Sequence, residues 1–442
     1  MKKVKNRAFS ALLLAVCIIC GMVLYCIRFA DDAPSWATFG GNQSIYQGGL
    51  LTAGTIYDRN GVVLASAENG ERSYAGSASV RTANLHTTGD FEGNIGTGAL
   101  SVFADKLSGY SPITGLSGRG GEVTLTVDSS LNETAYAALA GRSGAVMVMD
   151  YTTGEVLCMV SSPSFDPLYG FDSSDAGYDG VYLNRAISSA FTPGSVFKLV
   201  TTAAALENIP DIYSRKFTCT GQVDVGGVTV TCTGYHGEQT IEQALANSCN
   251  CAFAEISLEL GADTLEKYAS DMGFTSQHDI SGAKTAAGSF EKAAAGSADL
   301  AWSGIGQYTD LVCPYSMLRY VSSIANGGEA VTARVNMDER SSKTRLLSAD
   351  TADRLSEMML YNVTAAYGEW TFPGLKMGAK SGTAETGDGT SHAWFTGFLD
   401  DEEHPYAFVV MIEHGGGGLR NAGAVANTVL QAAVSKNMKS GD

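Results

Sequence analysis

The order of the predicted elements indicates an α+β fold, in which an antiparallel sheet packs against helices. Strand patterns lie at both ends of the region 122–436, and helical patterns lie between them instead of alternating with single strands. A hairpin at 143–161 that turns at Thr153 and Gly154 makes the first strand pair antiparallel. The chain has 442 residues, of which 45% are hydrophobic, and this is enough for two or three domains with buried cores.

A run of about 20 uncharged, mostly apolar residues at 8–27 predicts a membrane-crossing helix, because a rise of about 1.5 Å per residue spans a hydrocarbon core of about 30 Å. A cleaved signal peptide is the alternative, but the run is long for one, and Arg28 stands where a cleavage site needs small residues. We therefore expect a cytoplasmic tail at 1–7, a single anchor at 8–28 in the cell membrane, and an extracytoplasmic remainder. The basic residues that orient the anchor are Lys2, Lys3, Lys5 and Arg7.

The segment after the anchor contains no strong core pattern. Residues 29–49 are small and polar and are expected to form a linker. At 54–65 the letters GTIYDRNGVVLA predict a strand, a turn at RNG and a second strand. The region 50–121 is rich in Gly, Ser and Thr and too small for an independent catalytic domain, so we expect a β-rich, non-catalytic pedestal.

The region 122–436 has the stronger patterns and is expected to form the catalytic domain, with a short tail at 437–442. Alternating residues at 122–127 predict a strand, and Asp128 begins an amphipathic helix that extends to about residue 140. The other expected helices are 195–208, 241–260, 264–272, 314–326, 349–360 and 422–435, and the late strands are 375–384, 392–399 and 406–413.

Charge and cysteine content exclude some classes of function. The formal net charge of −17 argues against nucleic-acid binding, because phosphate recognition needs clustered Lys and Arg. No CxxC pair and no Cys/His cluster stands out in the sequence, so we expect no metal site and no zinc. Cys219 and Cys232 flank a predicted hairpin that turns at Gly226 and Gly227. The hairpin would bring the two sulfurs together either as a disulfide or as reduced thiols, and the pattern leaves both open.

Ser195 and Lys198 form the first candidate catalytic pair. Pro193 and Gly194 break the chain just before a helix, so Ser195 should lie in the first helical turn, near backbone N–H groups. Residues three apart share a helix face, and a lysine in apolar surroundings loses its proton more easily, so Lys198 could activate the serine. A helix cap beside a surface lysine is the plainer interpretation. The same spacing recurs in a loop-like stretch, at Ser281/Lys284 and Ser289/Lys292.

Two further patterns favour the first pair. Ser248 and Asn250 lie in an apolar segment that predicts a buried turn, unlike the same spacing at Ser130/Asn132 and Ser435/Asn437. The letters GLKMGAKSGTAE predict a strand that carries Lys380, Ser381 and Gly382, where glycine lets a ligand backbone come close. The similar tripeptide at 439–441 has no strand around it.

The three patterns occur in the order S-x-x-K, S-x-N and K-S-G, which is the signature order of class A β-lactamases and penicillin-binding proteins. On these residues the chain resembles the class B penicillin-binding proteins, the membrane-anchored peptidoglycan D,D-transpeptidases. The resemblance covers about 122–433, through blocks such as TGEVLCMVSSPSFDP, HGEQTIEQALANSCNCAF and HAWFTGFL. It implies the penicillin-binding transpeptidase fold, which is similar to that of serine β-lactamases. Tyr308 departs from the family, which usually has Gly there.

The resemblance also implies the acylation chemistry. Ser195 would attack the carbonyl between two D-alanines of a stem peptide, with Lys198 as the base, and form an acyl-enzyme while the terminal D-alanine leaves. Ser248 and Lys380 would deliver the proton to the leaving amine. A neighbouring stem-peptide amine would complete the cross-link.

For substrate binding, the resemblance assigns the donor's amide to Asn250 and its terminal carboxylate to the hydroxyls of Ser381 and Thr383, with Gly382 between them. The backbone N–H groups of Ser195 and Thr383 would form the oxyanion hole. No metal or organic cofactor is implied.

The resemblance implies stem peptides ending in D-Ala-D-Ala and β-lactam antibiotics as partners. Fewer than about 100 residues separate the anchor from the catalytic region, which leaves no room for a glycosyltransferase domain, so we expect a glycan-polymerising membrane partner. Two other functions would use the same acylation. A serine β-lactamase needs a base for deacylation, and no glutamate in a recognisable loop supplies one. A β-lactam sensor would need a signalling partner or extra spans.

Overall fold

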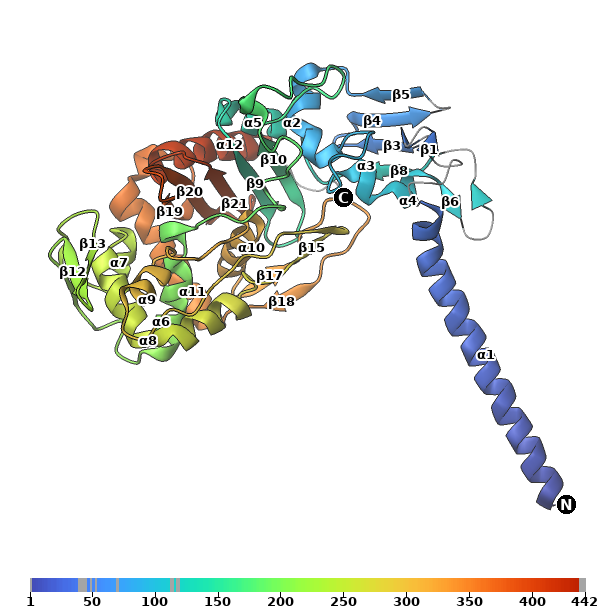
Figure 1. Cartoon of the computed structure of the whole chain (residues 1–442), viewed down its shortest axis with the longest axis horizontal. Helices are drawn as coiled ribbons and strands as arrows, with labels where there is room; N and C mark the ends of the chain where they lie inside the picture. Colours follow the sequence, from blue (N-terminus) through green and yellow to red (C-terminus); the bar gives the residue numbers. More distant parts are fainter. Residues whose placement is uncertain are drawn as a thin grey trace.

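The computed structural model describes residues 2–38, 46–47, 50–51, 54–68, 71–111, 115–116 and 120–436. A long N-terminal helix leads into a small lobe, and a larger lobe with a five-stranded sheet between helices follows (Figure 1). This arrangement confirms the predicted α+β class. The predicted tail at 437–442 lies outside the described residues.

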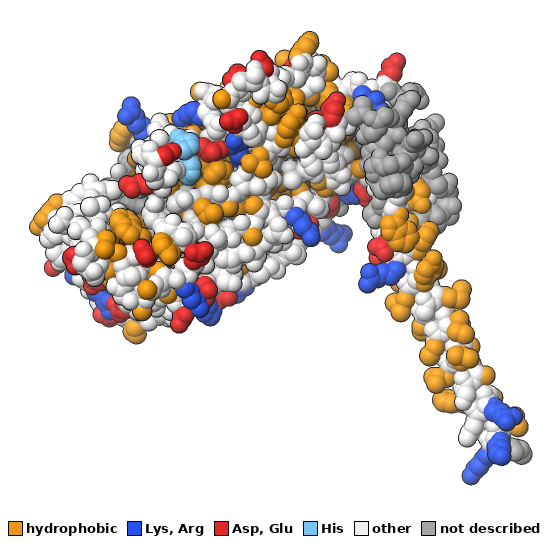
Figure 2. Space-filling model, in the orientation of Figure 1, with side chains coloured by type: hydrophobic (Ala, Val, Ile, Leu, Met, Phe, Trp, Pro, Cys, Tyr) orange, Lys and Arg blue, Asp and Glu red, His pale blue; other side chains and the backbone are white. Residues whose placement is uncertain are grey.

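Helix α1 (Lys2–Ala37) projects away from both lobes, and its apolar segment is fully exposed. Apolar side chains line it, and basic side chains gather at its far end (Figure 2). Within the described part of the chain, it is the one helix long and apolar enough to cross a membrane. The helix continues to Ala37, so the first part of the segment expected as a linker (29–49) is helical instead. Once nucleated in the apolar run, a helix extends at little cost.

The small lobe contains the predicted strand, turn and second strand. The turn has Gly61 at a φ of 80°, a left-handed conformation that favours glycine. Its sheet has the order β5-β4-β3-β8, and β8 pairs parallel to β3. The strands are β3 (Gly54–Tyr57), β4 (Val63–Glu68), β5 (Glu71–Tyr74) and β8 (Glu122–Thr124).

The small lobe also contains helix α2 (Ala78–Thr88), which the sequence did not predict. Its buried face is largely polar, so the apolar period that marks a helix is missing. The buried groups are satisfied by hydrogen bonds instead. Asn84 Nδ2 donates to the Ser129 carbonyl at 3.2 Å, and a ring nitrogen of His86 bonds the Val181 carbonyl at 2.7 Å.

Buried polar contacts join the small lobe to the large one at the turn between β3 and β4. The Asp58 carboxylate accepts hydrogen bonds from the Ser129 hydroxyl at 2.7 Å and from the Val62 N–H at 2.8 Å. Arg59 and Arg334 both pair with Glu155, at 3.3 and 2.6 Å. Removing one partner of such a buried set leaves a charge without compensation, so these contacts hold the two lobes in one relative position.

The sheet of the large lobe is antiparallel throughout, in the order β10-β9-β21-β20-β19, so β19 is an edge strand. The hairpin of β9 and β10 turns at Gly154, as predicted, with a φ of 79°. The strands are β9 (Gly144–Asp150), β10 (Val156–Ser162), β19 (Met377–Glu385), β20 (Ser391–Leu399) and β21 (Tyr406–Ile412).

Each face of this sheet supports a hydrophobic core. Helices α5 (Ser129–Leu139) and α12 (Ala424–Ser435) cover one face, where Val146 and Val148 are buried. The neighbouring Met147 points to the other face, toward helix α10 (Pro314–Ala325). Alternate strand residues point to opposite faces, so both faces must be covered for the strands to be apolar throughout. As predicted, the Asp128 carboxylate caps α5 by accepting a hydrogen bond from the Leu131 N–H.

The predicted helix at 241–260 is interrupted. Its first part is α7 (Ile241–Ala246), and a turn separates this from α8 (Asn250–Asp271). Helix α8 continues past a kink at Gly261 and contains nearly all of the predicted helix 264–272. The remaining helices and short strands are α3 (Ala99–Val102), α4 (Ala104–Leu107), α6 (Lys198–Asn208), α9 (Ala298–Ser303), α11 (Ala349–Asn362), β1 (Tyr46–Gln47), β2 (Leu50–Leu51), β6 (Tyr110–Ser111), β7 (Gly115–Leu116), β11 (Phe217–Cys219), β12 (Gln222–Val225), β13 (Val228–Thr231), β14 (Gly237–Gln239), β15 (Asp279–Ile280), β16 (Ala283–Lys284), β17 (Glu329–Val331) and β18 (Lys343–Arg345).

Candidate active site

Ser195 lies in a single 3-10 turn, η2 (Gly194–Val196), immediately before helix α6. Gly194 has a φ of 56°, and a Cβ there would lie 2.6 Å from the carbonyl oxygen of Thr383. Only glycine fits this position, and its absent side chain lets the turn pack directly against β19. The ring N–H of Trp394, on β20, also donates to the Thr192 carbonyl at 2.9 Å. The sheet therefore holds Ser195 beside the edge strand.

Ser248 lies in the turn between α7 and α8, as predicted for a buried turn between helical pieces. Its φ of 53° is in the left-handed region, which costs a non-glycine residue on the order of 1–3 kcal/mol. Asn250 is the first residue of α8, and its Nδ2 donates to the carbonyl of Thr231 at 2.8 Å. The turn thus directs the Ser248 hydroxyl and the Asn250 amide toward the same lysine.

Lys198 is fully buried, and its amine is held by this turn. Its Nζ donates to the Ser248 carbonyl at 2.6 Å and to Asn250 Oδ1 at 2.8 Å, and it lies 3.3 Å from Ser248 Oγ. Among the described residues, none of its hydrogen bonds goes to Ser195. Burial lowers the pKa of Lys198 from 10.5 to about 7, against the opposing effect of nearby cysteine thiols. A neutral amine is the form that can accept a proton.

Lys380 approaches the same hydroxyl from β19. Its Nζ donates to Ser248 Oγ at 3.1 Å and to the Ser381 carbonyl at 2.9 Å, and the side chain is fully buried. Burial and then the charge of Lys198 lower the pKa of Lys380 well below its usual value. The Ser248 hydroxyl therefore lies between two buried amines and provides a path for a proton from one to the other.

Ser381, Gly382 and Thr383 follow on the strand edge. The Tyr367 hydroxyl accepts a hydrogen bond from the Ser381 N–H at 2.9 Å and lies 3.1 Å from Ser381 Oγ. The sequence did not predict this contact. Tyr367 lies ten residues before β19 begins at Met377, and no motif marks it. At Gly382 a Cβ would lie 2.9 Å from the Pro193 carbonyl, so this glycine also permits the close contact between β19 and the serine turn.

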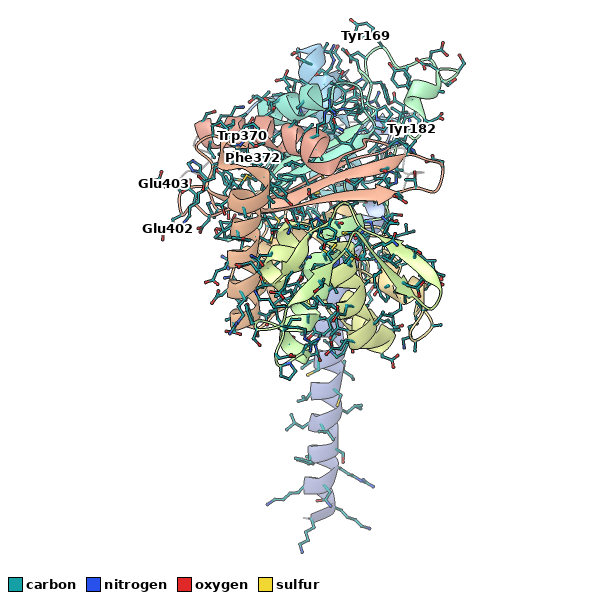
Figure 3. All side chains as sticks on the ribbon, turned by 90° about the vertical axis from the view of Figure 1, so that its left-hand side faces the viewer. Tyr169, Tyr182, Trp370, Phe372, Glu402 and Glu403 are labelled. Atoms are coloured by element: carbon teal, nitrogen blue, oxygen red, sulfur yellow. The ribbon has the colours of Figure 1, made fainter. Side chains whose placement is uncertain are left out.

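A cavity of about 480 Å³ opens above these groups. Ser195, Ser248, Asn250, Ser381 and Thr383 line it, so the structure brings all three predicted motifs together around one space. Seen from the side, β19 and β20 cross directly above the helical part of the lobe (Figure 3). The sequence did not predict these further lining residues: Thr231, Thr233, Asp299, Trp302, Gln307 and Glu385.

Tyr308 also lines the cavity and is 44% exposed. Its φ is 67°, the left-handed conformation in which glycine is unstrained. Tyr308 therefore has the backbone conformation that suits glycine, and it adds an aromatic ring at the mouth of the cavity.

The two alternative serine and lysine pairs lie outside the cavity. The Ser281 hydroxyl accepts a hydrogen bond from the Val335 N–H at 2.9 Å. Lys292 is half-exposed and pairs with Glu266 at 2.8 Å and Asp263 at 3.1 Å. These contacts explain why the same spacing creates no second site there.

Cys219 and Cys232 flank a hairpin of β12 and β13, which confirms the predicted turn at Gly226 and Gly227. Both cysteines are free thiols, so of the two alternatives the structure has the reduced one.

Comparisons with known proteins find relatives that cover the same part of the chain. A family model described as the penicillin binding protein transpeptidase domain matches residues 144–433. The peptidoglycan D,D-transpeptidase PbpA of Mycolicibacterium smegmatis is 27% identical over 383 residues, which is 77% of this chain and 77% of that protein.

Two solved structures have the same fold. The D,D-transpeptidase domain of a peptidoglycan glycosyltransferase from Eggerthella lenta has a TM-score of 0.74 and 28% identity, and the match covers 87% of this chain and 98% of that one. Penicillin-binding protein A from M. tuberculosis, solved as an imipenem acyl-enzyme complex, has a TM-score of 0.72 and 24% identity, with 86% and 98% covered.

Proposed function

The chain belongs to the penicillin-binding protein transpeptidase family, and we propose that it cross-links peptidoglycan through an acyl-enzyme on Ser195. It is a serine-type D,D-transpeptidase that releases D-alanine from stem peptides and is acylated by penicillin. One observation carries the assignment of the residues. The Ser248 hydroxyl lies between the buried amines of Lys198 and Lys380, beneath a cavity that Ser195 lines.

These contacts support the part of the proton path that runs from Lys198 through Ser248, and we propose the following steps. Neutral Lys198 takes the proton of Ser195 as its oxygen attacks the carbonyl between the two D-alanines. The proton then moves through the Ser248 hydroxyl, with Lys380 beside it, to the nitrogen of the leaving D-alanine, and the C–N bond breaks. In the second half, the acceptor amine attacks the ester carbonyl and gives its proton to Lys198, which passes it to the Ser195 oxygen as the C–O bond of the ester breaks. No step needs a metal or an organic cofactor.

Substrate binding follows from the other lining groups. Asn250 provides an amide for the donor's backbone, and the hydroxyls of Ser381 and Thr383 lie on the strand edge for its terminal carboxylate. We propose that the backbone N–H groups of Ser195 and Thr383 bind the developing oxyanion. The close contact that Gly194 permits between the two segments supports this. Loss of one such donor typically costs 10²–10³ in rate.

Amine-dependent transfer distinguishes this function from the alternatives. The full chain in detergent should release D-alanine from a peptide ending in D-Ala-D-Ala and form a new amide only when an acceptor amine is present, as read by mass spectrometry of the products. Rapid turnover of a labelled penicillin would instead indicate a β-lactamase. A stable penicillin adduct without any peptide transfer would indicate a sensor.

Helix α1 is a candidate membrane anchor. We propose that residues 1–7 stay in the cytoplasm, because four basic residues precede the apolar run, and that the catalytic lobe faces the outside, where peptidoglycan is assembled. A reporter fused after Asp442 should be active only outside the cytoplasm. Release of a form that lacks roughly its first thirty residues would contradict an uncleaved anchor.

The proposed function also needs polymerised glycan. The described part of the small lobe is built on a four-stranded sheet and helices α2 to α4, and we propose that a membrane partner makes the glycan. Co-purification of a glycan polymerase after cross-linking in membranes would test this, and its absence would count against it.

A further inference from the structure

Four potential metal ligands meet beside the active site, although they come from four separate positions in the chain. They are Cys219 at the end of β11, Cys232 just after β13, His236 just before β14, and Cys249 in the turn before α8. Their sulfur and nitrogen atoms all lie within 4.8 Å of one another. Cys219 and Cys249 are fully buried and the other two are half-buried, which leaves one side open to entry.

The spacing of these atoms matches tetrahedral zinc. Zinc bonds of about 2.3 Å to sulfur and 2.1 Å to nitrogen, at tetrahedral angles, place two sulfurs about 3.8 Å apart and a sulfur and a nitrogen about 3.6 Å apart. The Sγ atoms of Cys232 and Cys249 are 3.8 Å apart, and Cys232 Sγ lies 3.6 Å from His236 Nδ1. The other pairs of ligand atoms are at most 4.8 Å apart, so their distances need to shorten by only about 1 Å to reach the same geometry.

One surrounding contact fits a bound thiolate. The backbone N–H of Asn250 donates to Cys232 Sγ at 3.2 Å, which is the kind of outer contact that orients a metal-bound sulfur. The composition of three cysteines and one histidine is typical of closed, structural zinc sites. One zinc ion satisfies all four side chains at once.

We propose that Cys219, Cys232, His236 and Cys249 bind one structural zinc ion that ties the β12–β13 hairpin to the catalytic turn. On binding, the three thiols lose their protons to solvent and the histidine binds as the neutral ring, so no oxidant is required. We expected no metal from the sequence because no CxxC pair and no evident Cys/His cluster lies outside its apolar run. Of the four ligands only Cys232 and His236 are close in sequence.

The position of the ion gives it a role in the site without contact to substrate. The hairpin has little core of its own, since Val225 and Val230 are its fully buried side chains among the described residues. Yet Thr231 of this hairpin accepts the hydrogen bond that orients Asn250 and lines the cavity. Zinc would hold Thr231 against Asn250, and Cys249 lies between Ser248 and Asn250. The ligands are therefore positioning residues for the S-x-N motif.

Metal analysis of the full chain, purified in detergent without chelators, tests the site directly. We expect about one zinc per chain. We expect the Cys219→Ser and His236→Ala variants to lose most of it. The matched control is Cys313→Ser, which makes the same change at another buried cysteine, the N-cap of α10, where serine is well tolerated. This control should keep its zinc.

A second measurement does not depend on how the variants fold. Parent protein stripped of zinc and loaded with Co²⁺ should show strong visible absorption and a thiolate charge-transfer band, which identify tetrahedral coordination by sulfur. Weak absorption typical of six-coordinate cobalt would overturn the proposal. So would a parent with no more zinc than Cys219→Ser, or a non-reduced parent whose mass shows a Cys232–Cys249 disulfide. None of these outcomes bears on transfer to an amine, so the proposed function is tested separately.

Discussion

Replacing Ser195 with alanine is expected to abolish covalent labelling of the protein by a fluorescent penicillin. The hydroxyl is the atom that forms the ester, and the change removes it without altering the turn, whose conformation depends on Gly194. Labelling is read on a denaturing gel and by intact mass, where the parent should gain the mass of one penicillin and the variant none.

The other serines of the same spacing are the matched controls. Ser281→Ala and Ser289→Ala should label like the parent, because neither residue lines the cavity. An adduct that persists in the Ser195 variant, with its mass mapped to a different peptide, would mean that another residue is the nucleophile.

Replacing Lys198 with methionine should lower the second-order rate of penicillin acylation by about 10²–10⁴, the usual contribution of a positioned general base. Methionine fills a similar buried volume without an amine, so the α6 core should remain packed. Lys292→Met removes the lysine of the alternative pair Ser289/Lys292 and should acylate at the parent rate.

The pH dependence of the parent tests the same role. Burial lowers the pKa of Lys198 to about 7, and only the neutral amine accepts the serine proton. The acylation rate should therefore be level above about pH 7 and fall about tenfold per unit below it. Because Lys380 shares the Ser248 hydroxyl, the midpoint belongs to the pair of lysines. A rate that keeps rising toward pH 10 would show that Lys198 has an ordinary pKa and is not held as a neutral base.

The structure refines one expectation about the lysines. From the sequence we expected a neutral Lys198 because it lies in apolar surroundings near a helix start, and because the charge of Lys380 would repel a second charge beside it. The structure agrees on burial but shows the two amines joined through Ser248 Oγ, with the charge of Lys198 lowering the pKa of Lys380. This coupling depends on a strand and a turn 132 residues apart. No local pattern records such a distance.

Local features of the sequence were enough for much of the fold. The long apolar run predicted α1, the Asp128 cap predicted the start of α5, and the turn at Gly154 predicted the first hairpin, because each depends on neighbouring residues alone. Helix α2 was missed for the opposite reason. It buries polar side chains such as Asn84, which only distant carbonyl groups satisfy.

The same division applies to the site. The sequence by itself determined which residues form the three motifs, since glycine and proline beside Ser195 and the apolar segment around Ser248 are local features. Only the tertiary structure decided that both lysines meet at one hydroxyl, that Tyr367 holds the strand edge, and that Cys219, Cys232, His236 and Cys249 come together. Such contacts join residues far apart in the chain, and their geometry is set by how the sheet and helices pack rather than by the order of the amino acids along any one element.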